Sequence, residues 1–530
     1  MNEKKKAGGF LDFKDVDMII FIPTLLVFLA FVIWGLVDGS SMNHVMSGFL
    51  GFFTNKLGSL ILVITFCFFA FEIYIAFSKY GKIRLGADDD KPEHSYFNWF
   101  AMLFAACYGC GITFWGASEP LTFVATPVFN LEPYSAEAAE MGLAAAFNHW
   151  GPLPWCYTLI CSMAVGYWIY CKNMPPRFSL GLYPLFGKKH YGNWLCRLID
   201  GVLVMAAMCA GVTMFGFAIN QFGSGLNEVF GIATTNTVRL VCLVITVGLF
   251  TWSCLSGVKK GIAFLSRINI YLAVFLMVVV FGIGSTLFDL DLGVHAFGQF
   301  MNNFFALNFN TDPISQSGFP QAWTIFYWAW WISSAAQIGL FVASISKGRT
   351  MREMIIGLLV VAPLSTFCWF SVFGGGAIYQ QYFGGHDLVS VVLEKGAEYG
   401  AWAYLKTLPF FQIIGVLYLI LGFVFLVTSG DSGVFSWSQA SMKRTYNKIE
   451  PAKSIRLVYC LIWLVVCGIL LVNVGNSMSA IQAAGVSISV PCFIIFSLYC
   501  VSFYKAVKAD TPVTRAELDK QAAEVGRTEE

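Results

Sequence analysis

Residues 107–120 read CYGCGITFWGASEP and decide how the chain must fold. They lie inside an apolar segment from Trp99 to Ala125, yet they combine paired glycines with an acid and a proline. Glycines let a membrane helix leave α geometry, and the freed amides can then bind an anion while the freed carbonyls bind a cation. Close helix packing at small residues is the alternative interpretation. The spacing of Gly109 and Gly111 does not indicate a dinucleotide site, because no strand precedes them and the third glycine is missing.

The composition around this stretch is that of a polytopic membrane protein. The 530 residues are 57% hydrophobic and only 12% charged, with a mean hydropathy of +0.68. Soluble domains carry about 25% charged residues. The net charge of +2 indicates no nucleic-acid surface. Many of the fifteen cysteines fall in apolar runs, so we interpret them as reduced and buried, including the Cys107 and Cys110 pair.

Twelve apolar segments are long enough to cross a bilayer, which takes about 20 residues. The first seven are Met18 to Val37, Gly58 to Phe77, Trp99 to Ala125, Met141 to Tyr170, Leu198 to Phe222, Thr237 to Gly257 and Gly261 to Phe288. The other five are Ala322 to Ser346, Met351 to Gly374, Leu408 to Met442, Ile455 to Val474 and Ser479 to Val507. The first run is longer than the core of a signal peptide, about 7–15 residues, so we predict a retained span.

Positive charges predict that both termini are cytoplasmic. With that orientation, 29 of the 33 Lys and Arg residues lie on the inner side, as the positive-inside rule requires. The four on the outer side are Lys56, Arg239, Lys395 and Lys406. The segment 289–321 has no Lys or Arg and places phenylalanines at helical spacing, so we expect an amphipathic helix on the outer interface.

Two further spans carry groups that are unusual in lipid. The eighth span places several tryptophans beside hydroxyl and amide side chains, a mixture that fits a cavity better than lipid. These residues are Trp323, Trp328, Trp330, Trp331, Ser333, Ser334 and Gln337. Tryptophan faces attract a ligand cation by ~0.5–2 kcal/mol each, so several rings could hold a trimethylammonium group. In the tenth span, Thr428 and Ser429 can offer oxygens to sodium, although such hydroxyls commonly bond back to their own helix.

Taken together, these motifs resemble the betaine/carnitine/choline transporter family over nearly the whole chain. The motifs are Gly109-Cys110-Gly111, Phe114-Trp115-Gly116, Glu119-Pro120, His149-Trp150-Gly151, the run from Trp323 to Trp331, and Ser346-Lys347-Gly348-Arg349-Thr350. The segment from Thr311 to Trp331 is similar to the carnitine branch. The resemblance implies an all-α polytopic membrane protein whose core is two inverted five-helix repeats (the LeuT-type fold), each with a broken first helix. It also implies two leading N-terminal helices and a homotrimer.

The implied organisation divides the chain into six parts. They are a cytoplasmic tail (1–17), two leading helices with their loop (18–98), the first repeat (99–288), the outer interfacial segment (289–321), the second repeat (322–507) and a cytoplasmic tail (508–530). The resemblance places this chain in the cytoplasmic (inner) membrane of a prokaryote.

The resemblance also implies which residues bind substrate. Trp150, Trp155, Trp330 and Trp331 match positions of the family's aromatic box or its neighbours, and Trp323, Ser334, Tyr108, Gly109 and Gly111 complete the expected substrate site. The box is incomplete, because Ser334, Thr122 and Thr158 stand where relatives have aromatic residues. The substrate is therefore expected to be smaller, less methylated or held through other groups.

A second set of residues implies the coupling ion. Phe425, Thr428 and Ser429 match the family's sodium site, with the carbonyls of Ala105 and Tyr108 as partners. The sodium-independent carnitine antiporter places an arginine and a methionine in this region. Here Asn269 and Ile338 occupy those places, so sodium coupling is favoured.

The function expected from this resemblance is sodium-coupled uptake of a small betaine-type zwitterion by alternating access, with no other cofactor. One alternative is sodium-independent exchange of the carnitine/γ-butyrobetaine type, and another is transport of a less methylated zwitterion such as taurine. A membrane enzyme is disfavoured, because the six histidines are scattered and no cofactor motif occurs. Expected partners are the substrate, lipid and two further copies of the chain, and no nucleic acid.

Overall fold

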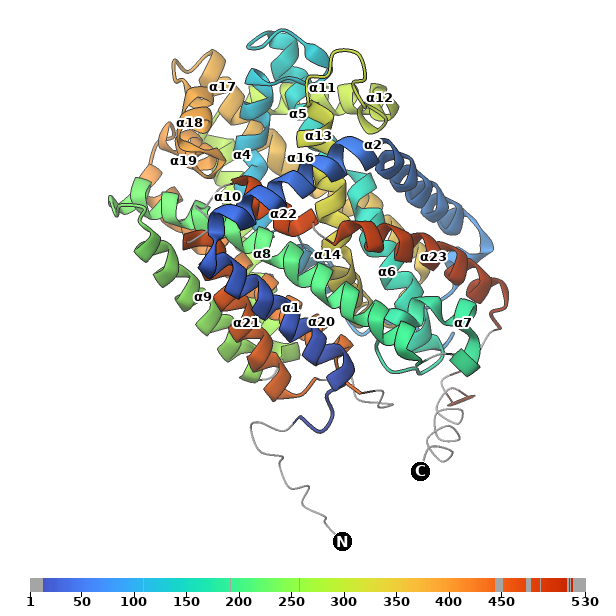
Figure 1. Ribbon diagram of the computed structural model, residues 1–530. Helices are drawn as coiled ribbons and strands as arrows, with labels where there is room; N and C mark the ends of the chain where they lie inside the picture. Colours follow the sequence, from blue (N-terminus) through green and yellow to red (C-terminus); the bar gives the residue numbers. More distant parts are fainter. Residues whose placement is uncertain are drawn as a thin grey trace.

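A computed structural model of the protein describes residues 13–107, 109–190, 192–256, 258–443, 451–472, 478–486, 488–511, 514 and 516–517. Within these ranges the regular elements are helices, apart from two isolated β-bridges. Figure 1 shows them as one bundle, with α11, α12 and α17 to α19 at one end and the start of α1 at the other. The predicted all-α polytopic architecture is confirmed.

The helices of the first half run to the outer segment after α10. They are α1 (Met18–Val37), α2 (Gly39–Phe77), η1 (Lys79–Lys82), α3 (Tyr96–Cys107), α4 (Gly109–Ala125), η2 (Val128–Asn130), α5 (Ala136–His149), α6 (Pro152–Cys171), η3 (Phe178–Leu182), α7 (Tyr183–His190), α8 (Trp194–Phe230), α9 (Asn236–Ser256), α10 (Val258–Ile283), α11 (Thr286–Asn302) and α12 (Phe304–Asn308).

The helices of the second half follow in the same way. They are α13 (Phe319–Ala322), α14 (Thr324–Ile345), α15 (Met351–Ile356), η4 (Gly357–Val361), α16 (Ala362–Phe370), η5 (Ser371–Gly375), α17 (Gly376–Tyr382), α18 (Leu388–Lys395), η6 (Ala397–Tyr399), α19 (Gly400–Lys406), α20 (Phe411–Ala440), α21 (Lys453–Val472), α22 (Met478–Val486) and α23 (Ser489–Lys508). The stretch from α15 to α17 is one span with two π-helical turns.

Ten helices in the described ranges are long and apolar enough to cross a membrane, or eleven if α3 and α4 count as one bent span. The predicted fourth span is not among them, and in the structure it divides into α5 and α6. Gly151 caps α6 with extended backbone and Pro152 is its first residue, which ends the preceding helix. The count of twelve and the inverted repeats stay predictions.

The third span is broken as the glycine pattern indicates. The axes of α3 and α4 differ by 64°. The expected break in the eighth span is wrong, because α14 is a continuous helix of 22 residues. Its sequence contains no proline and no glycine before Gly339, so nothing releases its backbone. Only Trp323, between α13 and α14, leaves helical geometry.

The loops form two separate groups. Asp17, before α1, pairs with Arg177 between α6 and α8 at 2.8 Å, and Lys172 of the same loop pairs with Asp510 after α23 at 3.3 Å. All of these residues belong to segments predicted to be cytoplasmic. The assignment of this face to the cytoplasm rests on the positive charges and stays a prediction.

The loops predicted to be outer also contact one another. The Tyr382 hydroxyl donates to the carbonyl of Ser135 at 3.1 Å, and the Ser224 hydroxyl donates to the carbonyl of Glu398 at 2.8 Å. The predicted amphipathic helix corresponds to α11, in which Phe300 is buried while Phe297 is exposed. The alternation of loops along the chain therefore agrees with the predicted span order.

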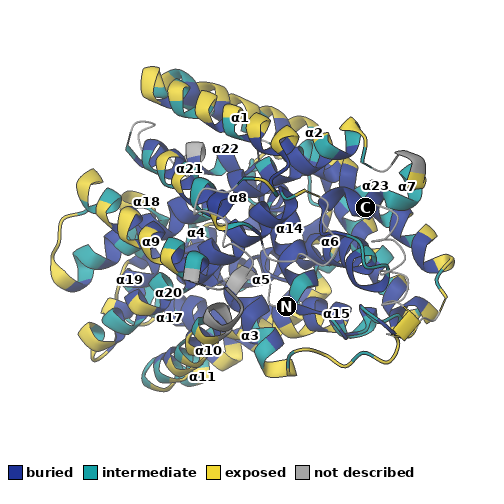
Figure 2. Cartoon of the chain, turned by 90° about the horizontal axis from the view of Figure 1, so that it is seen from below, coloured by how far each residue is buried: buried dark blue, intermediate teal, exposed yellow. Residues whose placement is uncertain are grey.

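Burial separates the functional spans from the peripheral ones. Figure 2 shows α14, α6 and α8 buried at the centre, while α1, α2, α9 and α10 expose one side. The aromatic run of the eighth span therefore lies inside the protein and not against lipid.

Arg177 offers a test of the loop packing, because it is buried between two carboxylates. Its guanidinium lies 2.8 Å from Asp17 and 3.3 Å from Asp200. Arg177→Met should lower stability by about 3–5 kcal/mol, since it takes the arginine from buried Asp200 and leaves Asp17, among the described residues, with Arg197 alone, at 3.5 Å. Thermal unfolding of the detergent-purified protein measures this loss. In the control Lys406→Met, which breaks an exposed pair with Glu228, the melting temperature should barely change.

Candidate functional site

A cavity lies inside the bundle where α4, α8 and α14 meet the junction of α5 and α6. About 30 Å³ within it is open to the centre of a water molecule. Its lining residues are Gly111, Trp150, Ala210, Gly211, Met214, Trp330, Trp331, Ser334, Gln337 and Ile338. No charged side chain belongs to this set. Larger hollows on the flanks of the bundle, such as the one between α8, α9 and α20, have apolar walls.

Three indole rings form the aromatic wall of the cavity. Trp150 and Trp331 lie with their ring centroids 5.7 Å apart at 67°, although 181 residues separate them in the chain. Trp330 is held by Phe217 of α8, at 5.5 Å in an edge-on arrangement. Gly111 faces the Trp150 ring, and a Cβ at this position would come within 2.4 Å of it. The glycine of α4 is therefore required for the ring to reach the cavity.

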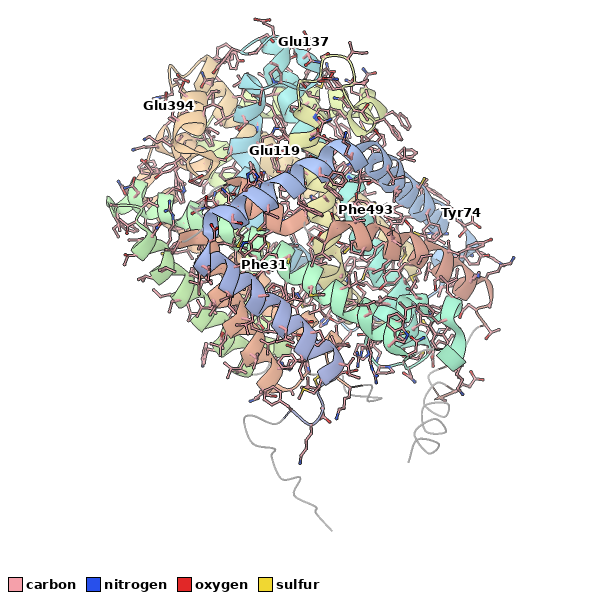
Figure 3. All side chains as sticks on the ribbon, in the orientation of Figure 1. Phe31, Tyr74, Glu119, Glu137, Glu394 and Phe493 are labelled. Atoms are coloured by element: carbon pink, nitrogen blue, oxygen red, sulfur yellow. The ribbon has the colours of Figure 1, made fainter. Side chains whose placement is uncertain are left out.

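The orientation of Trp150 depends on a buried acid. Glu119 of α4 is fully buried and accepts hydrogen bonds from the Trp150 indole N–H and the Tyr327 hydroxyl, each at 2.8 Å. Its other oxygen lies 2.6 Å from Nδ1 of His149. Figure 3 places Glu119 inside the bundle, below Glu137 and Glu394 at one end.

His149 extends this network to α14. Its Nε2 lies 3.0 Å from the Thr324 hydroxyl, and its ring stacks on Tyr327 at 4.7 Å with an interplanar angle of 6°. The hydroxyl of Thr366 in α16 also donates to the carbonyl of Trp150 at 2.9 Å. Residues from four segments thus fix one ring of the aromatic wall.

Other expected substrate residues lie beside the cavity and not in its wall. Trp155 packs behind Trp331 at 5.9 Å. Trp323 belongs to a separate aromatic cluster, 5.5 Å from Trp115 and 4.7 Å from Phe123. Gly109 faces α20, and Tyr108 lies outside the described residues.

Two polar side chains of α14 reach the cavity. The Ser334 hydroxyl donates to the carbonyl of Trp331 at 2.8 Å, which leaves its lone pairs available. Gln337, which sequence reasoning did not select for the substrate site, is buried, and its Oε1 has no hydrogen-bond partner among the described residues. Its place seven residues after Trp330, two helical turns along α14, is the signal that could have identified it.

The predicted sodium residues converge at the break of the third span. The Ser429 hydroxyl lies 3.5 Å from the carbonyl oxygen of Ala105. A Cβ on Gly109 would overlap the Phe425 ring at 1.9 Å, so this glycine lets α20 approach the break. The Thr428 hydroxyl bonds back to the carbonyl of Phe425 at 2.9 Å, as the alternative interpretation expects, but a hydroxyl oxygen keeps lone pairs for a cation.

The carbonyl and hydroxyl oxygens at this break suit a hard cation. All of them belong to neutral groups, so no charged side chain is needed as a ligand. Among the described residues, no three His, Cys, Asp or Glu side chains are placed to hold a metal ion. Carbonyl and hydroxyl oxygens beside a broken helix are the groups that hold sodium in transporters built on such helices. The residues present therefore fit a sodium ion.

Comparisons with known proteins agree with this architecture. The model of the betaine/carnitine/choline family transporters matches residues 19–512. The glycine betaine transporter OpuD of Bacillus subtilis is 33% identical over 505 residues, covering 94% of this chain and 97% of the relative. The ectoine/hydroxyectoine transporter of Virgibacillus pantothenticus is 30% identical over 504 residues, covering 95% and 98%. An osmo-dependent choline transporter of Acinetobacter baylyi is 30% identical over 499 residues, covering 93% and 72%.

Replacing Glu119 tests the network around Trp150. Glu119→Leu would remove the acceptor that Trp150, Tyr327 and His149 share, and a buried donor that loses its acceptor costs about 1–3 kcal/mol. We expect a marked fall in the melting temperature of the purified protein, and a smaller fall for Glu119→Gln, which keeps one acceptor oxygen. Glu394→Gln, on an exposed site, is the control. Equal stability of Glu119→Leu and the unmodified protein would contradict the role of the network.

Proposed function

Since this chain belongs to the betaine/carnitine/choline transporter family, we propose that it moves a small betaine-type zwitterion into the cell together with sodium. Membership in this family makes the chain a multi-pass membrane transporter and not an enzyme. The observation that carries the proposal is the uncharged cavity walled by Trp150, Trp330 and Trp331.

The aromatic wall suits the cationic end of such a substrate. A quaternary ammonium group has no N–H to donate, so it gains little from hydrogen-bond acceptors, whereas the faces of indole rings attract it directly. Relatives of this chain are named transporters of glycine betaine, ectoine and choline. The Gln337 amide could donate to a substrate carboxylate, and the Ser334 hydroxyl could do so by turning away from the Trp331 carbonyl.

Sodium coupling is the finer part of the proposal. Its first support is the approach of the Ser429 hydroxyl to the Ala105 carbonyl. Its second support is the short distance along the chain from the ion site to the substrate cavity: Gly111, which lies against the ring of Trp150, comes two residues after Gly109. The same broken segment therefore contributes to the ion site on one side and to the substrate cavity on the other. Sodium binding would order the broken segment and so favour substrate binding, and substrate binding would favour sodium binding in the same way. The two binding sites would then be thermodynamically coupled.

The remaining parts of the proposal rest on the family. We place the transporter in the cytoplasmic membrane of a prokaryote, with both termini inside and three copies assembled as a homotrimer. Alternating access would follow from rocking of one helix bundle against the other around the central cavity. The alternatives are sodium-independent exchange of the carnitine/γ-butyrobetaine type and transport of a less methylated zwitterion such as taurine.

Uptake into proteoliposomes tests sodium coupling. Radiolabelled glycine betaine should accumulate only with an inward sodium gradient, and Thr428→Ala combined with Ser429→Ala should raise the sodium concentration needed. Thr246→Ala, whose hydroxyl donates to the carbonyl of Cys242 in its own helix α9, is the control. Accumulation that is indifferent to sodium would refute the coupling, and counterflow without any ion gradient would select the exchanger.

Substitution of the indoles tests the aromatic wall. Trp150→Ala and Trp331→Ala should each weaken binding of a quaternary ammonium substrate by about 1–2 kcal/mol, because each removes one cation–π contact. Isothermal titration with glycine betaine in saturating sodium measures the change. The control is Trp194→Ala at the exposed start of α8. Unchanged affinity in both variants would remove these rings from the binding site.

A further inference from the structure

Helix α10 presents two buried polar side chains to the region of the ion site. The helix packs against both α3 and α20, the two elements that carry the predicted sodium ligands. Ser266 and Asn269 lie three residues apart, on one face of α10, and both are fully buried. The amide Nδ2 of Asn269 donates to the Thr428 hydroxyl at 3.3 Å. This face of α10 is therefore in direct contact with a residue of the ion site.

The oxygens of these two side chains lack partners. Among the described residues, neither Oγ of Ser266 nor Oδ1 of Asn269 has a hydrogen-bond partner. Buried polar atoms in folded proteins are normally paired, and an unpaired one calls for a bound ion, water or ligand. The two oxygens lie one turn apart on α10, and Asn269 contacts the Thr428 hydroxyl, so a hard cation bound there would give these oxygens a partner.

We propose that α10 forms a third wall of the sodium site, with Asn269 as a direct ligand and Ser266 as a second oxygen on the same wall. The proposal rests on sodium coupling as proposed above. Sodium would then be held between the Ala105 carbonyl of α3, the Thr428 and Ser429 hydroxyls of α20, and the Asn269 side-chain carbonyl of α10. All of these ligands are neutral oxygens.

The hydrogen bond between Asn269 and Thr428 indicates how the ion acts on α10. In the arrangement described here the amide nitrogen faces the hydroxyl, and an N–H group repels a cation. A half-turn of the planar amide exchanges its nitrogen and oxygen, which brings Oδ1 beside the Thr428 oxygen so that both can bind one ion. Sodium would thus replace a direct contact between α10 and α20 with one that passes through the ion.

A sodium titration of the purified protein tests this inference without relying on transport. The melting temperature is recorded in detergent as NaCl replaces KCl at constant ionic strength, and the midpoint gives the apparent sodium affinity. Asn269→Ala should reduce that affinity at least about tenfold, as expected for loss of a group that holds the metal. Ser266→Ala should reduce it by a smaller factor, and Asn269→Asp, which keeps a side-chain oxygen, should retain sodium binding.

The control is Ser502→Ala. Its hydroxyl is also buried and unpaired among the described residues, but it lies on α23, which packs against other helices. The sodium affinity of this variant should equal that of the unmodified protein. An equal loss of affinity in Ser502→Ala and Asn269→Ala would overturn the assignment, because the effect would then be one of general stability.

The outcomes separate the inference from the function on which it rests. If the unmodified protein is not stabilised by sodium relative to potassium, sodium coupling itself fails. If it is stabilised and Asn269→Ala binds sodium equally well, only the third wall is overturned. If Asn269→Ala does not fold, Asn269→Ser is measured in its place. The serine hydroxyl is polar but too short to reach the ion as the asparagine side chain does. The sodium affinity of this variant must then fall, and an unchanged value overturns the inference.

Discussion

The break in the third span depends on neighbouring helices that cover its polar backbone. Lipid offers no hydrogen bonds, so irregular backbone at membrane depth must be satisfied by protein. On the α3 side of the break the carbonyl of Ala105 accepts from the Ser429 hydroxyl of α20 at 3.5 Å, and one turn into α4 the carbonyl of Thr113 accepts from Gln221 of α8 and Tyr418 of α20, each at 2.6 Å. The carbonyl of Ile112 accepts from the Trp369 indole of α16 at 2.9 Å. The helices that stabilise the break thus include α8, which lines the cavity, and α20, which carries the ion ligands.

This arrangement explains why the cavity can be free of charge. Glu119 is not among its lining residues, because its carboxylate holds the ring of Trp150 and the hydroxyl of Tyr327. A carboxylate within the cavity would attract the ammonium end of a zwitterion but would repel its carboxylate end. Ring faces and neutral polar groups avoid this conflict. The rings attract the ammonium end without repelling the carboxylate end, and the polar groups can bind the carboxylate end without repelling the ammonium end.

Particular elements show how far local sequence could predict the fold. Helix α1 begins and ends at the predicted residues, Met18 and Val37, because a continuous apolar run defines a span by length alone. The break after Cys107 followed from its glycines. The predicted break in the eighth span was wrong because it was inferred from the resemblance, while the residues of α14 favour a continuous helix. The division of the fourth span at Gly151 was missed, although Pro152 marks it.

The sequence by itself determined that the chain is a membrane transporter, the order of most of its spans, and the residue types available for a cationic substrate and a hard cation. Hydropathy, charge bias and glycine spacing are properties of neighbouring residues, so they can be recognised along the chain. Only the tertiary structure decided that Trp330 and Trp331 line the cavity while Trp323 joins another cluster, and that Asn269 meets Thr428. Those contacts depend on how each helix is rotated and which helix it packs against, and many distant side chains set that rotation together.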